Sequence, residues 1–208
     1  AMLGIVAMAG SQAALVGVAA GLVSWAPAAY LASFSSRLRP PTPEYLQLVA
    51  DNMPETTVDL VVAYLAVSLF APVGEELIFR GVLFRVARDR WGWARGAVIT
   101  ALFFGVVHWA PWHLFGLVAL GLLLALLYHL TRSLLAPMLA HASYNAVAMT
   151  LLVRSSNDHE EASAAAAGMS GADWAILTAS VALLAGLLFW LWRRAARLAA
   201  IRPEDDPR

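Results

Sequence analysis

The chain has 208 residues, of which 61% are hydrophobic and 13% charged, and its formal net charge is zero. An apolar share this high exceeds that of an ordinary soluble domain, so residues 1–208 are predicted to form a single integral-membrane domain. The balanced charge gives no reason to expect a nucleic-acid partner. The absence of cysteine excludes disulfides, thiolate catalysis and cysteine-ligated metals.

Long apolar segments predict an all-α fold, a polytopic transmembrane helix bundle of about six spans. The first span starts without the basic region of a signal peptide, so we expect a membrane helix there, with Pro27 kinking or ending it. Residues 35–57 are expected to form a polar loop, and residues 154–171 a polar linker. The predicted spans are residues 3–34, 58–90, 94–110, 113–130, 134–153 and 172–192.

The second predicted span is longer than a bilayer requires. A helix over residues 58–90 would be about 50 Å long against a hydrocarbon core of roughly 30 Å, so its arginine-rich end is expected to project into water before a turn at Trp91-Gly92-Trp93. Most arginines fall near this turn, at Arg132 and in the tail, which would share one side of a six-span bundle. That side is predicted to be cytoplasmic and to hold both termini, in a bacterial-type plasma membrane.

Two adjacent carboxylates, Glu75 and Glu76, interrupt the second span. A charge at the centre of a membrane helix costs about 2.5–3.5 kcal/mol on insertion scales, so such residues are candidates for a functional site. Glu76 and Arg80 are spaced i, i+4 with the acid first, which favours an ion pair on one helix face. Glu75 points about 100° away and is left outside this pair.

Two histidines can reach the level of Glu75. His108 lies about as far after the turn at residues 91–93 as Glu75 lies before it, so a helical hairpin places both at one depth. His141 shares a helix face with Asn145 on the fifth span, and it reaches the same depth if the 85–95 hairpin protrudes from the membrane. Phe104 shares a helix face with His108.

This set of residues supports hydrolysis of an acyl or peptide bond. A carboxylate and a neutral imidazole can flank and activate a water molecule, while a second histidine and an amide donate to the developing oxyanion. Zinc is the chemical rival, with Glu75, His108 and His141 as ligands, although the chain has no His-Glu-x-x-His motif. No metal or other cofactor is favoured.

Three ordered motifs resemble those of one protein family. Glu75-Glu76-Leu77-Ile78-Phe79-Arg80, then Phe104 to His108, then His141 to Asn145 are similar to the Glu-Glu-x-x-x-Arg, Phe-x-x-x-His and His-x-x-x-Asn motifs of CPBP proteins. These are the CAAX prenyl protease 2 and bacteriocin-processing (Abi) intramembrane proteases. The motifs fall within residues 74–146, inside an expected catalytic core of about residues 58–153.

The resemblance implies an intramembrane endopeptidase that cleaves membrane-bound or prenylated, CAAX-type substrates. It implies that Glu75, helped by His108, activates water, that His141 and Asn145 stabilise the oxyanion, and that Glu76 supports the site. We expect Arg80 and Phe104 to play supporting parts, and the bilayer and a peptide or lipidated protein to be the partners. Two alternatives stay open: a zinc-dependent form of the same protease, and a noncatalytic immunity, scaffold or proton-coupled transport protein.

Overall fold

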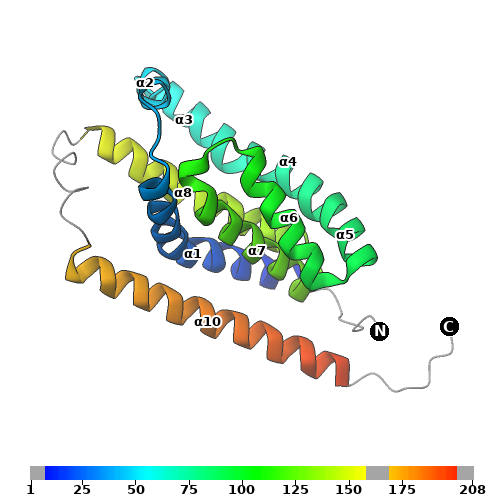
Figure 1. Ribbon diagram of the computed structural model, residues 1–208. Helices are drawn as coiled ribbons and strands as arrows, with labels where there is room; N and C mark the ends of the chain where they lie inside the picture. The colour runs from blue at the N-terminus through cyan, green and yellow to red at the C-terminus, as the bar shows by residue number, and fades with distance from the viewer. Residues whose placement is uncertain (1–7, 158–168, 201–208) are drawn as a thin grey trace.

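A computed structural model describes residues 8–157 and 169–200, and every regular element in these ranges is a helix. Helix α1 (Gly10–Leu38) packs against α8 (Leu135–Asn157), α7 (Leu114–Thr131) and α10 (Gly171–Ala200). Figure 1 shows α10 along one side of the bundle, with α1 between it and the remaining helices. The all-α helix bundle predicted from the sequence is confirmed.

Residues Thr57–Trp91 form one continuous helix of 35 residues, close to the predicted second span. It starts at a capping box, in which the Thr56 hydroxyl accepts from the Asp59 amide and the Asp59 carboxylate accepts from the Thr56 amide. Two short π-helical segments interrupt its α-helical geometry. In order, its parts are α3 (Thr57–Leu65), η1 (Ala66–Phe70), α4 (Ala71–Ile78), η2 (Phe79–Leu83) and α5 (Phe84–Trp91).

The predicted turn at Trp91-Gly92-Trp93 is present. Gly92 has a φ of 82°, a left-handed conformation that glycine adopts without steric cost, and α6 (Trp93–Val107) starts directly after it. Helix α6 ends at Val107, and Trp109, two residues later, is again left-handed, with a φ of 52°. A short 3₁₀ turn, η3 (Pro111–His113), then leads into α7.

The protein is an integral membrane helix bundle. In the described part of the chain, four helices are long and apolar enough to cross a membrane: Gly10–Leu38, Thr57–Trp91, Pro111–Thr131 and Gly171–Leu198. The other two predicted spans are also helical, but α6 is a shorter apolar helix of 15 residues, and α8 carries the polar side chains of His141 and Asn145. Backbone hydrogen bonds made within helices suit this environment, because hydrocarbon offers no partners for them.

Small residues bring α1 close to α8. A methyl group added at Gly17 would collide with the Ala136 carbonyl oxygen, and one added at Gly21 would collide with the Ser143 hydroxyl and the Ala140 carbonyl oxygen. Membrane helices often pack through small residues spaced four apart in the sequence. In a bilayer no hydrophobic effect drives helices together, so close van der Waals contact stabilises their association instead. Helix α8, which carries His141, is therefore fixed from behind by α1.

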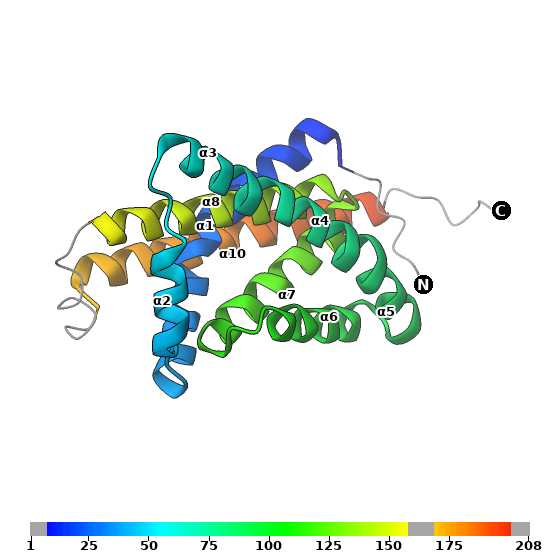
Figure 2. The same cartoon turned by 90° about the horizontal axis from the view of Figure 1, so that it is seen from above.

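The predicted polar loop over residues 35–57 is wrong in part. Helix α1 continues through Pro27 to Leu38, and a separate amphipathic helix, α2 (Pro43–Asp51), fills much of the loop and lies across the direction of α8 and α10 (Figure 2). Pro43 at the first position and the Thr42 hydroxyl, which accepts from the Tyr45 amide, explain where α2 starts. In the predicted linker, α8 extends to Asn157, and residues 158–168 lie outside the described residues.

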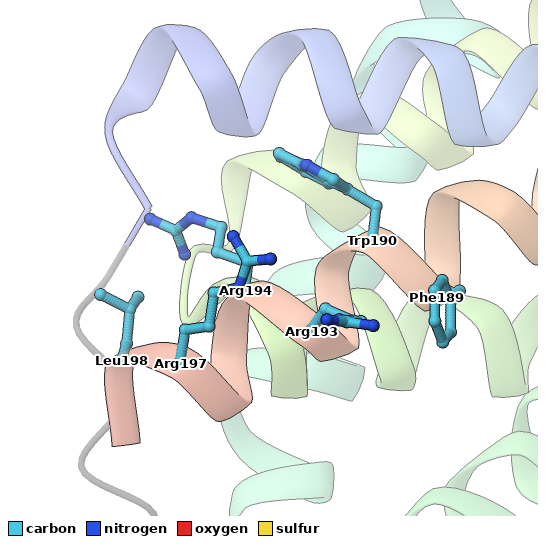
Figure 3. A pocket seen from close by; sticks show the side chains of 6 residues that line it. All are labelled: Phe189, Trp190, Arg193, Arg194, Arg197 and Leu198. Atoms are coloured by element: carbon cyan, nitrogen blue, oxygen red, sulfur yellow. The ribbon is translucent and has the colours of Figure 1, made fainter. Parts of the chain in front are cut away.

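Helix α10 begins at a second capping box, between Ser170 and Asp173. Its last turns combine aromatic residues with three arginines, shown in Figure 3: Phe189, Trp190, Arg193, Arg194 and Arg197.

Candidate active site

The two adjacent glutamates lie on α4, between the two π-helical segments. Each segment is marked by an amide that bonds a carbonyl five residues back: Ala71 to Ala66 in η1, and Phe84 to Phe79 in η2. Such single-turn π segments inside an α-helix occur often at functional sites, because they re-aim the side chains on either side. The helix that carries Glu75 and Glu76 is thus irregular on both sides of them.

Pro72 explains the position of Asn145. In the π-helical register the next amide in line for the Val67 carbonyl is that of residue 72, and proline has no N–H to donate. The Asn145 Nδ2 atom donates to this carbonyl at 2.9 Å. The amide side chain of α8 therefore supplies the hydrogen bond that Pro72 cannot, and it ties α8 to the helix that carries Glu75.

Glu76 and Arg80 form the ion pair that their spacing predicts. Arg80 Nη1 lies 2.7 Å from Glu76 Oε1, and both side chains are almost wholly buried. Arg80 Nη2 donates to the Gly121 carbonyl of α7 at 2.9 Å, and the guanidinium carbon lies 5.0 Å from the centre of the Phe104 ring. The cost of burying this ion pair is offset by the hydrogen bond to α7 and by the contact of the guanidinium with the Phe104 ring.

Glu76 also holds His141. The Nδ1 atom of His141 lies 3.1 Å from Glu76 Oε1, the oxygen that accepts from Arg80. This arrangement fixes the ring of a histidine that is only 3% exposed. The Phe104 ring packs on the same imidazole in a T-shaped arrangement, with ring centres 5.6 Å apart.

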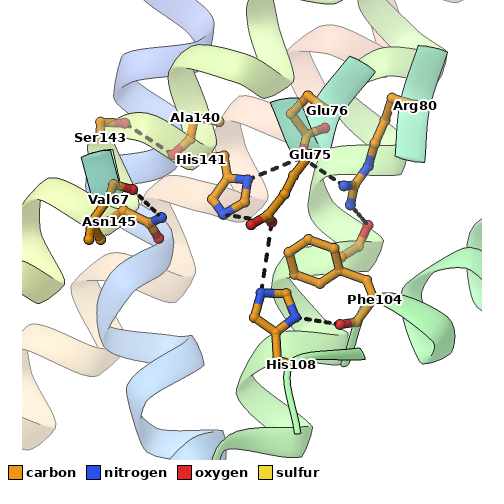
Figure 4. A network of polar contacts seen from close by, with 11 residues as sticks. Val67, Glu75, Glu76, Arg80, Phe104, His108, Ala140, His141, Ser143 and Asn145 are labelled. Atoms are coloured by element: carbon orange, nitrogen blue, oxygen red, sulfur yellow. Dashed lines mark hydrogen bonds and ion pairs between the residues drawn. The ribbon is translucent and has the colours of Figure 1, made fainter. Parts of the chain in front are cut away.

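Glu75 lies between the two histidines, as Figure 4 shows. Its Oε2 atom is 3.8 Å from His108 Nε2 and 3.9 Å from His141 Nε2. The Glu75 and His108 side chains are 32% and 29% exposed, so the cluster is open on the side of His108 and closed on that of His141. The predicted hairpin geometry thus brings Glu75 and His108 together, and His141 reaches the same depth.

The hydrogen bonds at the outer ring nitrogens select one tautomer for each neutral histidine. His108 Nδ1 lies 2.6 Å from the Phe104 carbonyl, which can only accept, so Nδ1 carries the proton. Glu76, an acceptor for Arg80, imposes the same tautomer on His141. Both Nε2 atoms then present lone pairs toward Glu75, so three acceptor atoms converge on one point. A water molecule there can donate to two of them, and a proton can be shared between Glu75 and one imidazole.

The same convergence bears on metal binding. Histidine ligands commonly hold their second ring nitrogen to a carboxylate or a backbone carbonyl, as His108 and His141 do, so the donor types of Glu75, His108 and His141 suit zinc. Within residues 8–157 and 169–200, however, no group of three or more metal-binding side chains is spaced to hold an ion.

The structure brings together six of the seven residues singled out in the sequence, and places the seventh, Asn145, beside them on Val67. Three contributors were missed: Pro72, the Val67 carbonyl and the Gly121 carbonyl. Pro72 could have been found, because a proline inside a predicted helix always frees a carbonyl about one turn earlier. The Val67 and Gly121 carbonyls could not have been found, because the side chain of a residue does not indicate what its backbone oxygen binds.

Part of the chain is similar to known proteins. Residues 57–147 match the type II CAAX prenyl endopeptidase Rce1-like family. The chain is 33% identical over 107 residues to an Escherichia coli protein named "Uncharacterized 24.3 kDa protein", covering 49% of this chain and 48% of that protein. It is 32% identical over 78 residues to the Bacillus subtilis "Putative membrane peptidase YdiL", covering 38% of this chain and 32% of that protein.

These matches span about half or less of each relative's length. No solved structure gives a significant match. The matched residues include all three motifs, from Glu75 to Asn145, together with both π-helical segments. The family resemblance predicted from those motifs is therefore confirmed: residues 57–147 are similar to the type II CAAX prenyl endopeptidase Rce1-like family.

Proposed function

We propose that the protein is an intramembrane endopeptidase that hydrolyses a peptide bond in membrane-bound or prenylated substrates, with water activated by Glu75 and His108. The observation that carries the proposal is the convergence of Glu75 Oε2 with the Nε2 atoms of His108 and His141, at 3.8 and 3.9 Å. A water molecule held there can donate one proton to the carboxylate and one to an imidazole, which leaves its lone pair free to attack a carbonyl.

The proposed reaction keeps its protons within the cluster. As the water oxygen attacks the peptide carbonyl carbon, Glu75 accepts the proton that the water loses. The protonated Glu75 then gives this proton to the nitrogen of the leaving amine as the carbon–nitrogen bond breaks. His108 orients the water through Nε2, because its Nδ1 proton is committed to the Phe104 carbonyl.

We propose that His141 and Asn145 stabilise the oxyanion, as the family resemblance implies. His141 can donate from Nε2 only as an imidazolium, because Nδ1 already carries the proton that Glu76 accepts. Glu75 and Glu76 supply an acceptor at each of its ring nitrogens. Asn145 has a second N–H besides the one given to Val67, and this second donor can face the substrate.

The substrate class follows from the setting and the family. The cluster lies among helices that cross a bilayer, so a substrate that is itself membrane-bound reaches it without leaving the membrane. The family description is that of a CAAX prenyl endopeptidase, and we extend prenylated CAAX-type peptides to the present chain as part of the proposal. A bacterial-type plasma membrane with both termini in the cytoplasm completes the proposed setting.

A zinc-dependent form of the same reaction is the chemical alternative. Glu75, His108 and His141 would be the ligands, and bound zinc would lower the pKa of a water molecule toward neutrality. The noncatalytic alternative is proton-coupled transport. The row of ionisable side chains from Arg80 through Glu76, His141 and Glu75 to His108 favours it, because a proton relay needs such a row, with water bridging the 3.8 and 3.9 Å separations at Glu75.

Cleavage of a fluorogenic prenylated CAAX-type peptide by the purified protein in detergent tests the proposal. Glu75→Gln should lower the rate by about 10²–10⁴-fold, the usual contribution of a general base. Glu55→Gln is the matched control. Glu55 is an exposed glutamate that precedes the helix carrying Glu75 and lies twenty residues from Glu75 in the sequence. Retained activity in Glu75→Gln would refute the proposal.

A strong chelator distinguishes the two protease forms. Cleavage that survives chelation identifies Glu75 as the base acting without a metal. Cleavage that is lost on chelation and restored by zinc assigns Glu75, His108 and His141 as ligands. Proton flux across vesicles without cleavage of any membrane-bound peptide would replace both with the transport reading.

A further inference from the structure

The last turns of α10 carry a stripe of basic and aromatic side chains far from the glutamates in sequence. Its residues recur at spacings of three and four, which places them on one face of the helix. They line a hollow of about 510 Å³, within the size range of small-molecule sites, and Figure 3 shows them from close by. The stripe consists of Phe189, Trp190, Arg193, Arg194, Arg197 and Leu198.

The three arginines have no counter-charge in the described part of the chain. None of the ion pairs formed by residues 8–157 and 169–200 involves Arg193, Arg194 or Arg197. Among the described arginines, Arg80 and Arg88 form ion pairs, with Glu76 and Asp89. Three unpaired guanidinium groups within five residues are a strong local positive field.

Arg194 adds an observation that positive charge alone does not explain. Its Nη1 atom is buried and has no hydrogen-bond partner among residues 8–157 and 169–200. A buried, unsatisfied donor is costly, and for a charged group the cost is higher than for a neutral one. The guanidinium therefore lacks an acceptor at a defined place beside the hollow.

The neighbouring aromatic residues give the hollow an apolar wall. The Arg193 guanidinium lies 5.6 Å from the centre of the Phe189 ring, so one arginine is held against an aromatic face. Phe189 and Trp190 are each about half exposed, on a helix that crosses the bilayer. The apolar wall thus lies on the membrane side, and the arginines lie where the span ends at Leu198.

We propose that this stripe is a binding site for the phosphodiester head group of an anionic phospholipid, with its acyl chain along Phe189 and Trp190. A phosphodiester offers two charged oxygens that match the fork of a guanidinium, which is why arginine is preferred at phosphate sites. The position at the predicted cytoplasmic end of α10 is where basic pockets meet anionic lipid head groups. A soluble phosphate would satisfy the arginines but leave the aromatic wall without a ligand.

Lipid binding to the full-length protein can be measured by native mass spectrometry from detergent, with phosphatidylglycerol and phosphatidylcholine as probes. We expect the wild-type protein to retain phosphatidylglycerol in preference to phosphatidylcholine. A contribution of about fivefold per arginine predicts that Arg193→Gln/Arg194→Gln/Arg197→Gln loses roughly 100-fold in phosphatidylglycerol affinity. The full chain keeps its acidic tail residues Glu204, Asp205 and Asp206 as competitors.

The matched control removes the same charge at the opposite end of the bundle. Arg37→Gln/Arg39→Gln/Arg154→Gln changes three exposed arginines and should leave the preference intact. The single variant Arg194→Gln, checked for an unchanged melting temperature, guards against a triple variant that fails to fold. We expect this variant alone to lose about fivefold.

Three results would overturn the proposal. Equal retention of both lipids by the wild-type protein would reduce the arginines to determinants of membrane orientation. An equal loss in the control triple variant would show a nonspecific charge effect. Displacement of phosphatidylglycerol by millimolar inorganic phosphate would make the site one for a free anion.

Discussion

Asn145 and Pro72 should be energetically coupled, although they lie on different helices. Asn145→Ala removes the donor that satisfies the Val67 carbonyl, and Pro72 leaves no backbone amide to replace it. Hydrogen bonds between membrane helices contribute about 0.6 kcal/mol on average and up to about 1.7 kcal/mol. Since this carbonyl has no substitute donor in its own helix, we expect a loss near the upper value, about 1–2 kcal/mol.

Pro72→Ala restores an N–H at the position from which the Val67 carbonyl can be reached. In this background the Asn145→Ala change should cost much less, so the double-mutant cycle should show a coupling free energy of about 1 kcal/mol. Unfolding in mixed micelles, followed by far-UV circular dichroism, measures the four variants. Strictly additive losses would refute the inference that Asn145 replaces the missing proline amide.

Activity in the same four variants separates the two roles of Asn145. If its second N–H stabilises the oxyanion, Asn145→Ala should lower kcat about 10²–10³-fold in both backgrounds, the usual cost of one oxyanion donor. Recovery of kcat in Pro72→Ala/Asn145→Ala would instead assign Asn145 to helix positioning alone.

Three further predictions test the packing around the site. Arg80→Met should lose about 3–5 kcal/mol in unfolding free energy because it leaves Glu76 charged and buried, and Glu76→Gln/Arg80→Met should recover part of that loss; a double variant less stable than Arg80→Met would contradict this. Gly21→Ala should cost about 1–3 kcal/mol in unfolding free energy by pushing α1 away from α8. Gly186→Ala, which has open space around it, should be neutral or stabilising when unfolding is followed by circular dichroism. Trp109→Val should be about 1–2 kcal/mol less stable than Trp109→Gly, because only glycine takes a φ of 52° without strain, and equal melting temperatures would disprove it.

Much of the site could be predicted because its spacing is helical. The i, i+4 pair of Glu76 with Arg80 and the nearly equal distances of Glu75 and His108 from Gly92 depend only on helix geometry and one turn, and the structure has both. The position of His141 depended on how far the 85–95 hairpin protrudes, which periodicity alone does not fix.

What the sequence did not predict involves the backbone. The π-helical segments change the register by one residue, and side-chain patterns carry little trace of that shift. Helix α2 was overlooked because proline and charged residues suggested a loop, although Thr42-Pro43 is a helix start. The polar composition of residues 35–57 was given more weight than the helix start at Thr42-Pro43.

The polar residues of α8 also bear on how the protein is made. His141 and Asn145 find their partners on Glu76 and Val67, and the small residues of α8 fit against Gly17 and Gly21, all of which precede α8 in the chain. When α8 is synthesised and inserted, the helices that carry its partners have therefore already been synthesised. Measured insertion of α8 should be poor in isolation and efficient behind residues 1–134, so the order of synthesis itself helps to assemble the site.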